Sequence, residues 1–86
     1  MDSSDFKPGY HLVHITKGEI GCLSKIQEEL DELKDAENQN SKILIIVELA
    51  DLFGAVELYA EKLGITLDDL HKFSNITRRA FENGRR

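Results

Sequence analysis

Residues 41–63, SKILIIVELADLFGAVELYAEKL, decide the fold of this chain. They predict a helix that is apolar almost all round, and such a helix must be buried by other helices. Only Glu48 and Asp51 interrupt its central part. Spaced i and i+3, they lie on one helix face, where two like charges are costly unless they are paired or bind a cation. The stretch therefore predicts both a buried helix and a functional site on it.

The length and composition of the chain limit it to one small domain. Its 86 residues leave no room for a second core, so oligomerisation is a natural remedy. A content of 41% hydrophobic and 31% charged residues is typical of a helical, folded protein rather than a disordered one. The net charge of −5 argues against a general nucleic-acid binder. We expect a single domain over residues 1–86.

The N-terminus, MDSSDFKPGY, is polar and acidic, unlike a signal or transit peptide. Glu48 and Asp51 interrupt the one long apolar run, so no membrane span is predicted. The single cysteine, Cys22, excludes an intrachain disulfide and fits a reducing compartment. These features predict a cytoplasmic protein without membrane or nucleic-acid partners.

The N-terminal segment contributes little to the predicted function. Residues 1–12 are expected to form a flexible arm, and YHLVHI at residues 10–15 reads as a short extended stretch that cannot form a sheet alone. His11, His14 and Cys22 have no fourth ligand at a usual spacing. A structural zinc site is therefore not expected.

Residues 18–36 predict a first helix, because apolar side chains recur every three or four residues. The stripe consists of Ile20, Leu23, Ile26, Leu30 and Leu33. At about 100° per residue, Glu29 and Glu32 lie beside this stripe. The remaining acids fall towards solvent, namely Glu28, Asp31 and Asp35. Taken alone, an acidic run of this kind is most often a solvated face.

A short polar link, ENQNS at residues 37–41, joins the first helix to the apolar one, which makes the two helices antiparallel neighbours. Two carboxylates lie shortly before the link and two shortly after it, so helix rise alone places them level across the hairpin. They are Glu29, Glu32, Glu48 and Asp51. Four converging carboxylates need a strong counter-charge, and Mg²⁺ or Mn²⁺ prefers oxygen ligands. The two pairs predict a divalent-metal site.

The ends of the second and third helices carry capping signals. Asn40 or Ser41 can cap the second helix, Gly64 ends it, and Thr66 with Asp69 forms a capping box for the third. The predicted buried stripe of the third helix comprises Leu67, Leu70, Phe73, Ile76 and Ala80. Polar residues on its other faces can donate to an anion, although cations near a helix C-terminus are also favoured by the helix dipole alone. These polar residues are Lys72, Asn75, Arg78 and Arg79.

These elements predict an all-α fold made of a helical hairpin plus a third helix. In a chain of three helices, the apolar helix cannot be covered on all sides by the others. A four-helix-bundle core is therefore expected to form on oligomerisation. We expect a homodimer or a homotetramer.

The acidic pattern also resembles a known family signature. Glu28-Glu29-x-x-Glu32, followed after residues 33–47 by Glu48-x-x-Asp51, resembles the EExxE and ExxD motifs of the MazG-like all-α nucleoside triphosphate pyrophosphohydrolases. In that family the motifs lie on two antiparallel helices of a four-helix bundle. The LGITLDDL entry to the third helix and the tail KFSNITRRAFENGRR are also similar to short MazG-like proteins.

The resemblance implies a role for each matching residue. It makes Glu29, Glu32, Glu48 and Asp51 the Mg²⁺ ligands. Glu28 and Glu29 become the catalytic acids, with Glu28 orienting water. The implied substrate-binding residues are Lys25, Lys72, Asn75 and Arg79, which would contact phosphates, and His14, which would approach the base.

The reaction implied by the resemblance is Mg²⁺-dependent hydrolysis of a nucleoside or deoxynucleoside triphosphate into the monophosphate and pyrophosphate, with Mn²⁺ as a possible substitute. Metal ions can neutralise the phosphates and lower the pKa of the attacking water. No Gly-rich phosphate loop or nucleophilic triad is present, so the metal must carry most of the catalysis. The alternative is a non-catalytic helical oligomerisation module, in which the acids are merely solvated; metal dependence separates the two.

Overall fold

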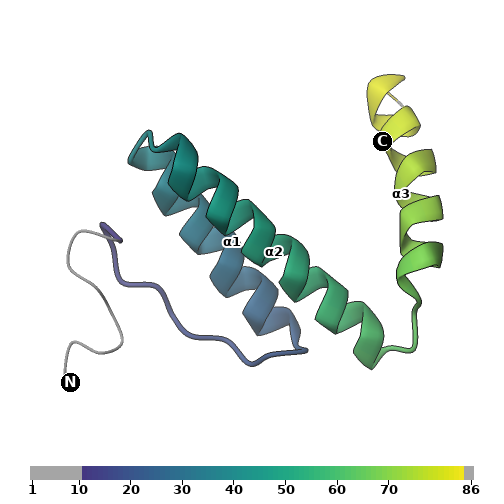
Figure 1. Ribbon diagram of the computed structural model, residues 1–86, viewed down its shortest axis with the longest axis horizontal. Helices are drawn as coiled ribbons and strands as arrows, with labels where there is room; N and C mark the ends of the chain where they lie inside the picture. Colours follow the sequence, from purple (N-terminus) through teal and green to yellow (C-terminus); the bar gives the residue numbers. More distant parts are fainter. Residues whose placement is uncertain (1–10, 85–86) are drawn as a thin grey trace.

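The computed structural model describes residues 11–84, which form three helices after an irregular N-terminal segment (Figure 1). Helix α1 covers Leu23–Asn38, α2 covers Lys42–Lys62 and α3 covers Leu67–Glu82. No residue from 11 to 84 lies in a strand. The predicted all-α fold with a hairpin and a third helix is therefore confirmed.

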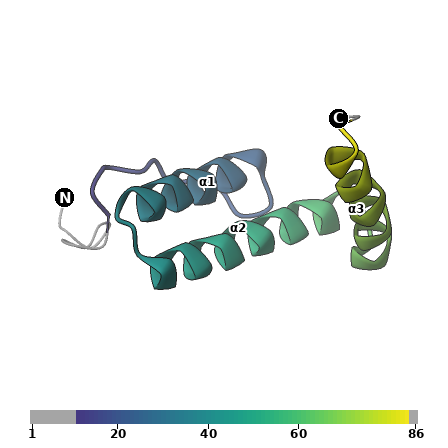
Figure 2. The ribbon, with the colours of Figure 1, turned by 90° about the horizontal axis from the view of Figure 1, so that it is seen from above.

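Helices α1 and α2 are antiparallel neighbours along most of their length (Figures 1 and 2). The turn between them contains Asn40, whose φ of 56° lies in the left-handed region. Ser41 then caps α2, because its Oγ accepts a hydrogen bond from the backbone N–H of Leu44 at 3.2 Å. The short polar link thus produces the hairpin that the sequence predicted.

Helix α1 begins at Leu23, five residues later than the predicted start at Gly18. Gly21 has a φ of 85°, and Cys22 is extended, so the chain cannot be helical there. The preceding backbone folds tightly over the first turn of α1: a Cβ at Gly18 would collide with the backbone carbonyl oxygen of Ser24. This segment covers part of the helix that the sequence pattern left open to solvent.

The junction between α2 and α3 follows the predicted capping signals. Gly64 has a φ of 78°, and the N–H groups of Gly64 and Ile65 donate to the carbonyl oxygens of Glu61 and Ala60, which is a Schellman motif. Thr66 Oγ1 accepts from the backbone N–H of Asp69 at 3.1 Å. Helix α3 then leaves the end of α2 at a steep angle and contacts α2 but not α1 (Figure 2).

The described chain buries small and acidic side chains and exposes large apolar ones. Its buried hydrophobic residues are Ala36, Ala55 and Ala60. On α2, Ile43 is 75% exposed, so the predicted burial of this helix on all sides is not reached within one chain. The predicted buried stripe of α3 is also wrong for the single chain, since Phe73 is 68% exposed and no described element covers it. None of the described helices meets the length and apolarity needed to span a membrane.

Candidate metal centre

Helices α1 and α2 bring four carboxylates together. One oxygen each from Glu29, Glu32, Glu48 and Asp51 lies within 4.8 Å of the others. Two come from α1 and two from α2, and each pair is spaced i and i+3 on its helix, which puts both members on the face towards the other helix. We call this group the carboxylate cluster.

The carboxylate cluster is buried on one side and open on the other. Glu48 is only 1% exposed and Glu29 only 5%, whereas Asp51 is exposed. A groove of about 370 Å³ opens beside them and is lined in part by Lys25 and Gly54. A ligand in this groove would therefore meet both the cluster and the ammonium group of Lys25.

Crowding among these acids changes their protonation. Burial, a hydrogen bond with Glu48 and repulsion from Glu29 raise the pKa of Glu32 to about 8. Burial and the charges of Glu29 and Glu48 also raise the pKa of Asp51, against a smaller opposing effect of Lys25. Without a cation, Glu32 therefore keeps its proton at neutral pH.

The side chains present fit a hard divalent cation. Glu29 Oε1 is buried and accepts no hydrogen bond from residues 11–84. Because an ionised carboxylate oxygen can only accept, it needs either a donor or a cation. Lys25 compensates part of the charge, because its Nζ lies 3.0 Å from Glu29 Oε2. Two oxygens bound to one Mg²⁺ at about 2.1 Å lie at most about 4.2 Å apart, so the observed spacing needs little closure. An all-oxygen donor set is the chemistry that Mg²⁺ and Mn²⁺ prefer.

Glu28 was predicted to face solvent, but the structure buries it. It is 5% exposed, and its Oε1 accepts hydrogen bonds from the Gly18 N–H at 2.9 Å and from Lys25 Nζ at 3.1 Å. Burial alone would raise its pKa, but these two donors hold the pKa below its ordinary value. Burial alone would lower the pKa of Lys25, but its hydrogen bonds with Glu29 and Glu28 outweigh this effect and raise the pKa of its ammonium group. Glu28 thus anchors the N-terminal segment and Lys25 beside the cluster.

Asp35 is also buried, at 3% exposure, where the sequence predicted a solvent-facing position. Both of its oxygens accept from the Leu12 N–H at 3.0 Å, and Oδ2 also accepts from Gln39 Nε2 and contacts His11 Nδ1 at 3.3 Å. The cause is the N-terminal segment, which runs back along α1 (Figure 1). His11 and Leu12, the end of the predicted flexible arm, are thus held in place; residues 1–10 lie outside the described part.

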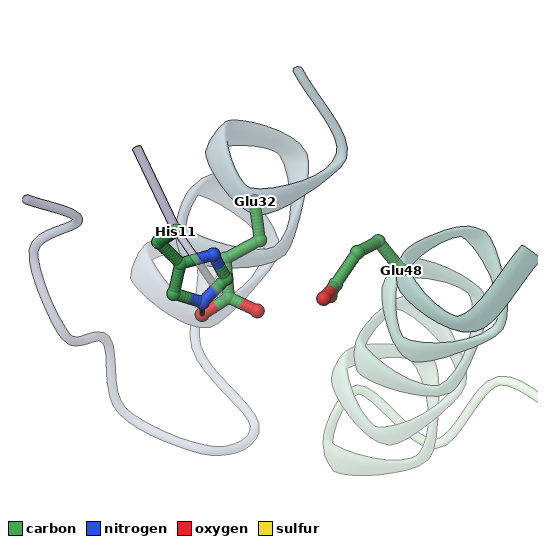
Figure 3. A group of neighbouring side chains, drawn as sticks. All are labelled: His11, Glu32 and Glu48. Atoms are coloured by element: carbon green, nitrogen blue, oxygen red, sulfur yellow. Dashed lines mark ion pairs between the residues drawn. The ribbon is translucent and has the colours of Figure 1, made fainter. Parts of the chain in front are cut away.

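His11 lies beside the acids, although its sequence context did not predict this. Its imidazole forms a second group with Glu32 and Glu48, with one ligand atom from each within 4.8 Å of the others (Figure 3). The only sequence signal was the pair of histidines in YHLVHI. Nothing local indicates that the chain returns to α1 and brings one of them to the acids.

The other predicted substrate-binding residues do not converge on the cluster within one chain. His14 is exposed and belongs to neither of the two groups. Asn75 and Arg79 line a separate hollow on α3, together with Arg78, and Lys72 is exposed on the same helix. Of the five predicted substrate-binding residues, only Lys25 forms an ion pair with an acid of the carboxylate cluster.

A model of the phosphoribosyl-ATP pyrophosphohydrolase family matches residues 7–79, which is most of the chain. The chain belongs to this family. The family is part of the all-α NTP pyrophosphatases, the superfamily that the paired acidic motifs resemble. Members of the phosphoribosyl-ATP pyrophosphohydrolase family hydrolyse phosphoric anhydrides, and their superfamily uses divalent metals. No curated protein and no solved structure matches the chain.

The raised pKa of Glu32 predicts how the stability of the metal-free protein depends on pH. Its pKa is about 8 in the folded chain against an ordinary value of 4.5, so between these values the folded state binds more protons than the unfolded state. The free energy of unfolding should therefore fall as the pH rises from about 4.5 to about 8. Thermal melts in EDTA across this range measure the effect.

The matched variant is Glu32→Gln, which keeps the shape of the side chain but cannot ionise. It should lose most of the pH dependence while keeping the fold. Equal slopes in Glu32→Gln and the unmodified protein would contradict the assignment to Glu32.

Proposed function

We propose that the protein is a Mg²⁺-dependent nucleoside triphosphate pyrophosphohydrolase. It cleaves a nucleoside or deoxynucleoside triphosphate between the α- and β-phosphates and releases the monophosphate and pyrophosphate; Mn²⁺ can replace Mg²⁺. The observation that carries the proposal is the carboxylate cluster between α1 and α2 in a chain of the phosphoribosyl-ATP pyrophosphohydrolase family. A nucleotide substrate and the free Cys22 both fit a cytoplasmic protein, with no role proposed for nucleic acid or membrane.

The four acids of the carboxylate cluster would hold the metal. A bound divalent ion neutralises phosphate charge and lowers the pKa of the attacking water. Glu29 would be a metal ligand, and together with Glu28 it orients Lys25, whose Nζ it contacts at 3.0 Å. Because the pKa of Lys25 is raised, its ammonium group stays charged and can bind a phosphate oxygen in the groove.

Glu28 would act mainly by position. Its Oε1 is engaged by Gly18 and Lys25, so contact with the attacking water would use the other oxygen. Holding Lys25 at the edge of the groove is a role that its contacts already support. We also propose that Glu28 orients the attacking water.

The exposed apolar faces support assembly into a homodimer or homotetramer. On α2, Ile46 is 61% exposed and Phe53 is 52% exposed, whereas Glu48 and Asp51 of the same helix lie beside the acids of α1. Burying one such side chain is worth about 1.5–3 kcal/mol, so several exposed ones favour association strongly. In the assembled protein, Lys72, Asn75, Arg79 and His14 would contact the nucleotide, and the four-helix core would form.

The oligomer can be tested by light scattering with one charged substitution. The unmodified protein should be a dimer or tetramer at micromolar concentration. Ile46→Glu should dissociate it, because a carboxylate would have to be buried in the interface. Lys42→Gln, also exposed on α2, should leave the assembly unchanged. A stable monomer of the unmodified protein would refute the assembly.

Metal binding should stabilise the fold. An ion present at about 100 times its dissociation constant contributes about 2.7 kcal/mol to the free energy of unfolding. Glu48→Gln and Asp51→Asn should each reduce the Mg²⁺-induced rise in melting temperature, because ligand charge is lost. Glu61→Gln, an exposed acid on α2, is the control. An equal rise in all four proteins would exclude the site.

The activity test uses a panel of nucleoside and deoxynucleoside triphosphates with Mg²⁺, extended to phosphoribosyl-ATP, with products resolved by ³¹P NMR. We expect monophosphate and pyrophosphate without diphosphate. Glu29→Gln should lower kcat about 100-fold or more, because a lost ligand displaces the charge that stabilises the transition state.

The matched control for the activity test is Glu37→Gln, an exposed acid on the same helix, which should change little. Diphosphate plus orthophosphate as products would show that the cleavage position is wrong. If no nucleotide reacts with Mg²⁺ or Mn²⁺, the non-catalytic oligomerisation module replaces the enzyme.

A further inference from the structure

We propose that His11 supplies a nitrogen ligand to a second metal position, which it shares with Glu32 and Glu48. The inference rests on the proposed metal-dependent function and goes beyond it, because the acidic motifs contain only oxygen ligands. It assigns a role to a residue of the N-terminal segment, far in sequence from both motifs. The ligand class is a divalent first-row ion that accepts imidazole as well as carboxylate.

The geometry of the three side chains suits a shared ion. They come from three different segments, and their ligand atoms lie within 4.8 Å of one another (Figure 3). His11 Nε2 is 3.9 Å from Glu32 Oε2, which is too long for a hydrogen bond. Two ligands at about 2.1 Å from one octahedral ion lie about 3.0–4.2 Å apart, so this gap has the right width for an ion between them.

Asp35 fixes which imidazole nitrogen faces the acids. Its carboxylate accepts hydrogen bonds from the Leu12 N–H and from Gln39 Nε2, as an ionised carboxylate does. It therefore also acts as the acceptor in its contact with His11 Nδ1. Nδ1 therefore carries the hydrogen, and in the neutral ring Nε2 presents its lone pair towards Glu32. A carboxylate that orients the far nitrogen of a histidine is a recurrent support for metal-binding imidazoles.

The surroundings favour a cation over a simple ion pair. Glu32 and Glu48 belong to both groups, so the second position would adjoin the first, with these two carboxylates between the ions. Glu29 in the adjoining group keeps a buried oxygen without a hydrogen-bond partner among residues 11–84, which indicates positive charge still to be supplied. Two adjacent divalent ions would supply this charge to both groups of side chains. Ions about 3.5–4 Å apart are usual in enzymes that cleave phosphoric anhydrides and esters.

The test is pulsed electron paramagnetic resonance of Mn²⁺ bound to untagged protein, which detects ¹⁴N coupling from a directly bound imidazole. The chain has three histidines, so each can be examined in turn. We expect an imidazole signal in the unmodified protein and in the double variant H14Q/H71Q, which keeps only His11. The signal should disappear in His11→Gln.

A second readout concerns the position of His11. Asp35→Asn removes one acceptor oxygen from its support and should lower Mn²⁺ affinity about tenfold in calorimetric titration, as loss of a supporting carboxylate typically does. His14→Gln, three residues from His11 and exposed, should not change the affinity.

Mn²⁺ bound without ¹⁴N coupling in H14Q/H71Q would overturn the role of His11 and leave the carboxylate site standing. No Mn²⁺ binding at all would overturn both. Because H14Q/H71Q leaves His11 and its contacts untouched, misfolding of His11→Gln would not affect this decision.

Discussion

Repulsion among carboxylates buried between α1 and α2 is the constraint on which the rest of the structure depends. Glu29 and Glu48 are almost inaccessible to water, and Glu32 and Asp51 crowd against them. Among residues 11–84, the ammonium group of Lys25 offsets only part of this charge, and the raised pKa of Glu32 reflects the repulsion that remains. A helix pair built only for stability would place apolar side chains there. The burial is explained if bound divalent ions offset this cost.

The same constraint accounts for the inverted distribution of side chains. The side of α2 that faces α1 carries the acids, so its large apolar side chains point outward, as the exposure of Ile43 and Ile46 shows. Small residues such as Ala36 and Ala55 are what the single chain buries. One chain therefore supplies a metal-binding hairpin, and the apolar surface that stabilises it has to be completed by other copies.

The sequence predicted what local patterns control. Apolar periodicity, the caps at Ser41 and Thr66 and the turn at Gly64 led to the three helices, and spacing on the hairpin placed the four acids at one level. It failed where a segment distant along the chain decides the outcome. Glu28 and Asp35 were expected in solvent because helix geometry alone says nothing of residues 11–22 folding back over α1. His11 was missed for the same reason.

Metal binding between α1 and α2 can be tested with an anomalous-scattering map of crystals grown with Mn²⁺ and a non-hydrolysable nucleoside triphosphate analogue. We predict a peak between the two helices, bound by carboxylate oxygens of Glu29, Glu32, Glu48 and Asp51, with the phosphates of the analogue in the groove beside Lys25. A map in which Mn²⁺ occurs only elsewhere on the protein, with no ion in contact with these four carboxylates, would contradict this metal site.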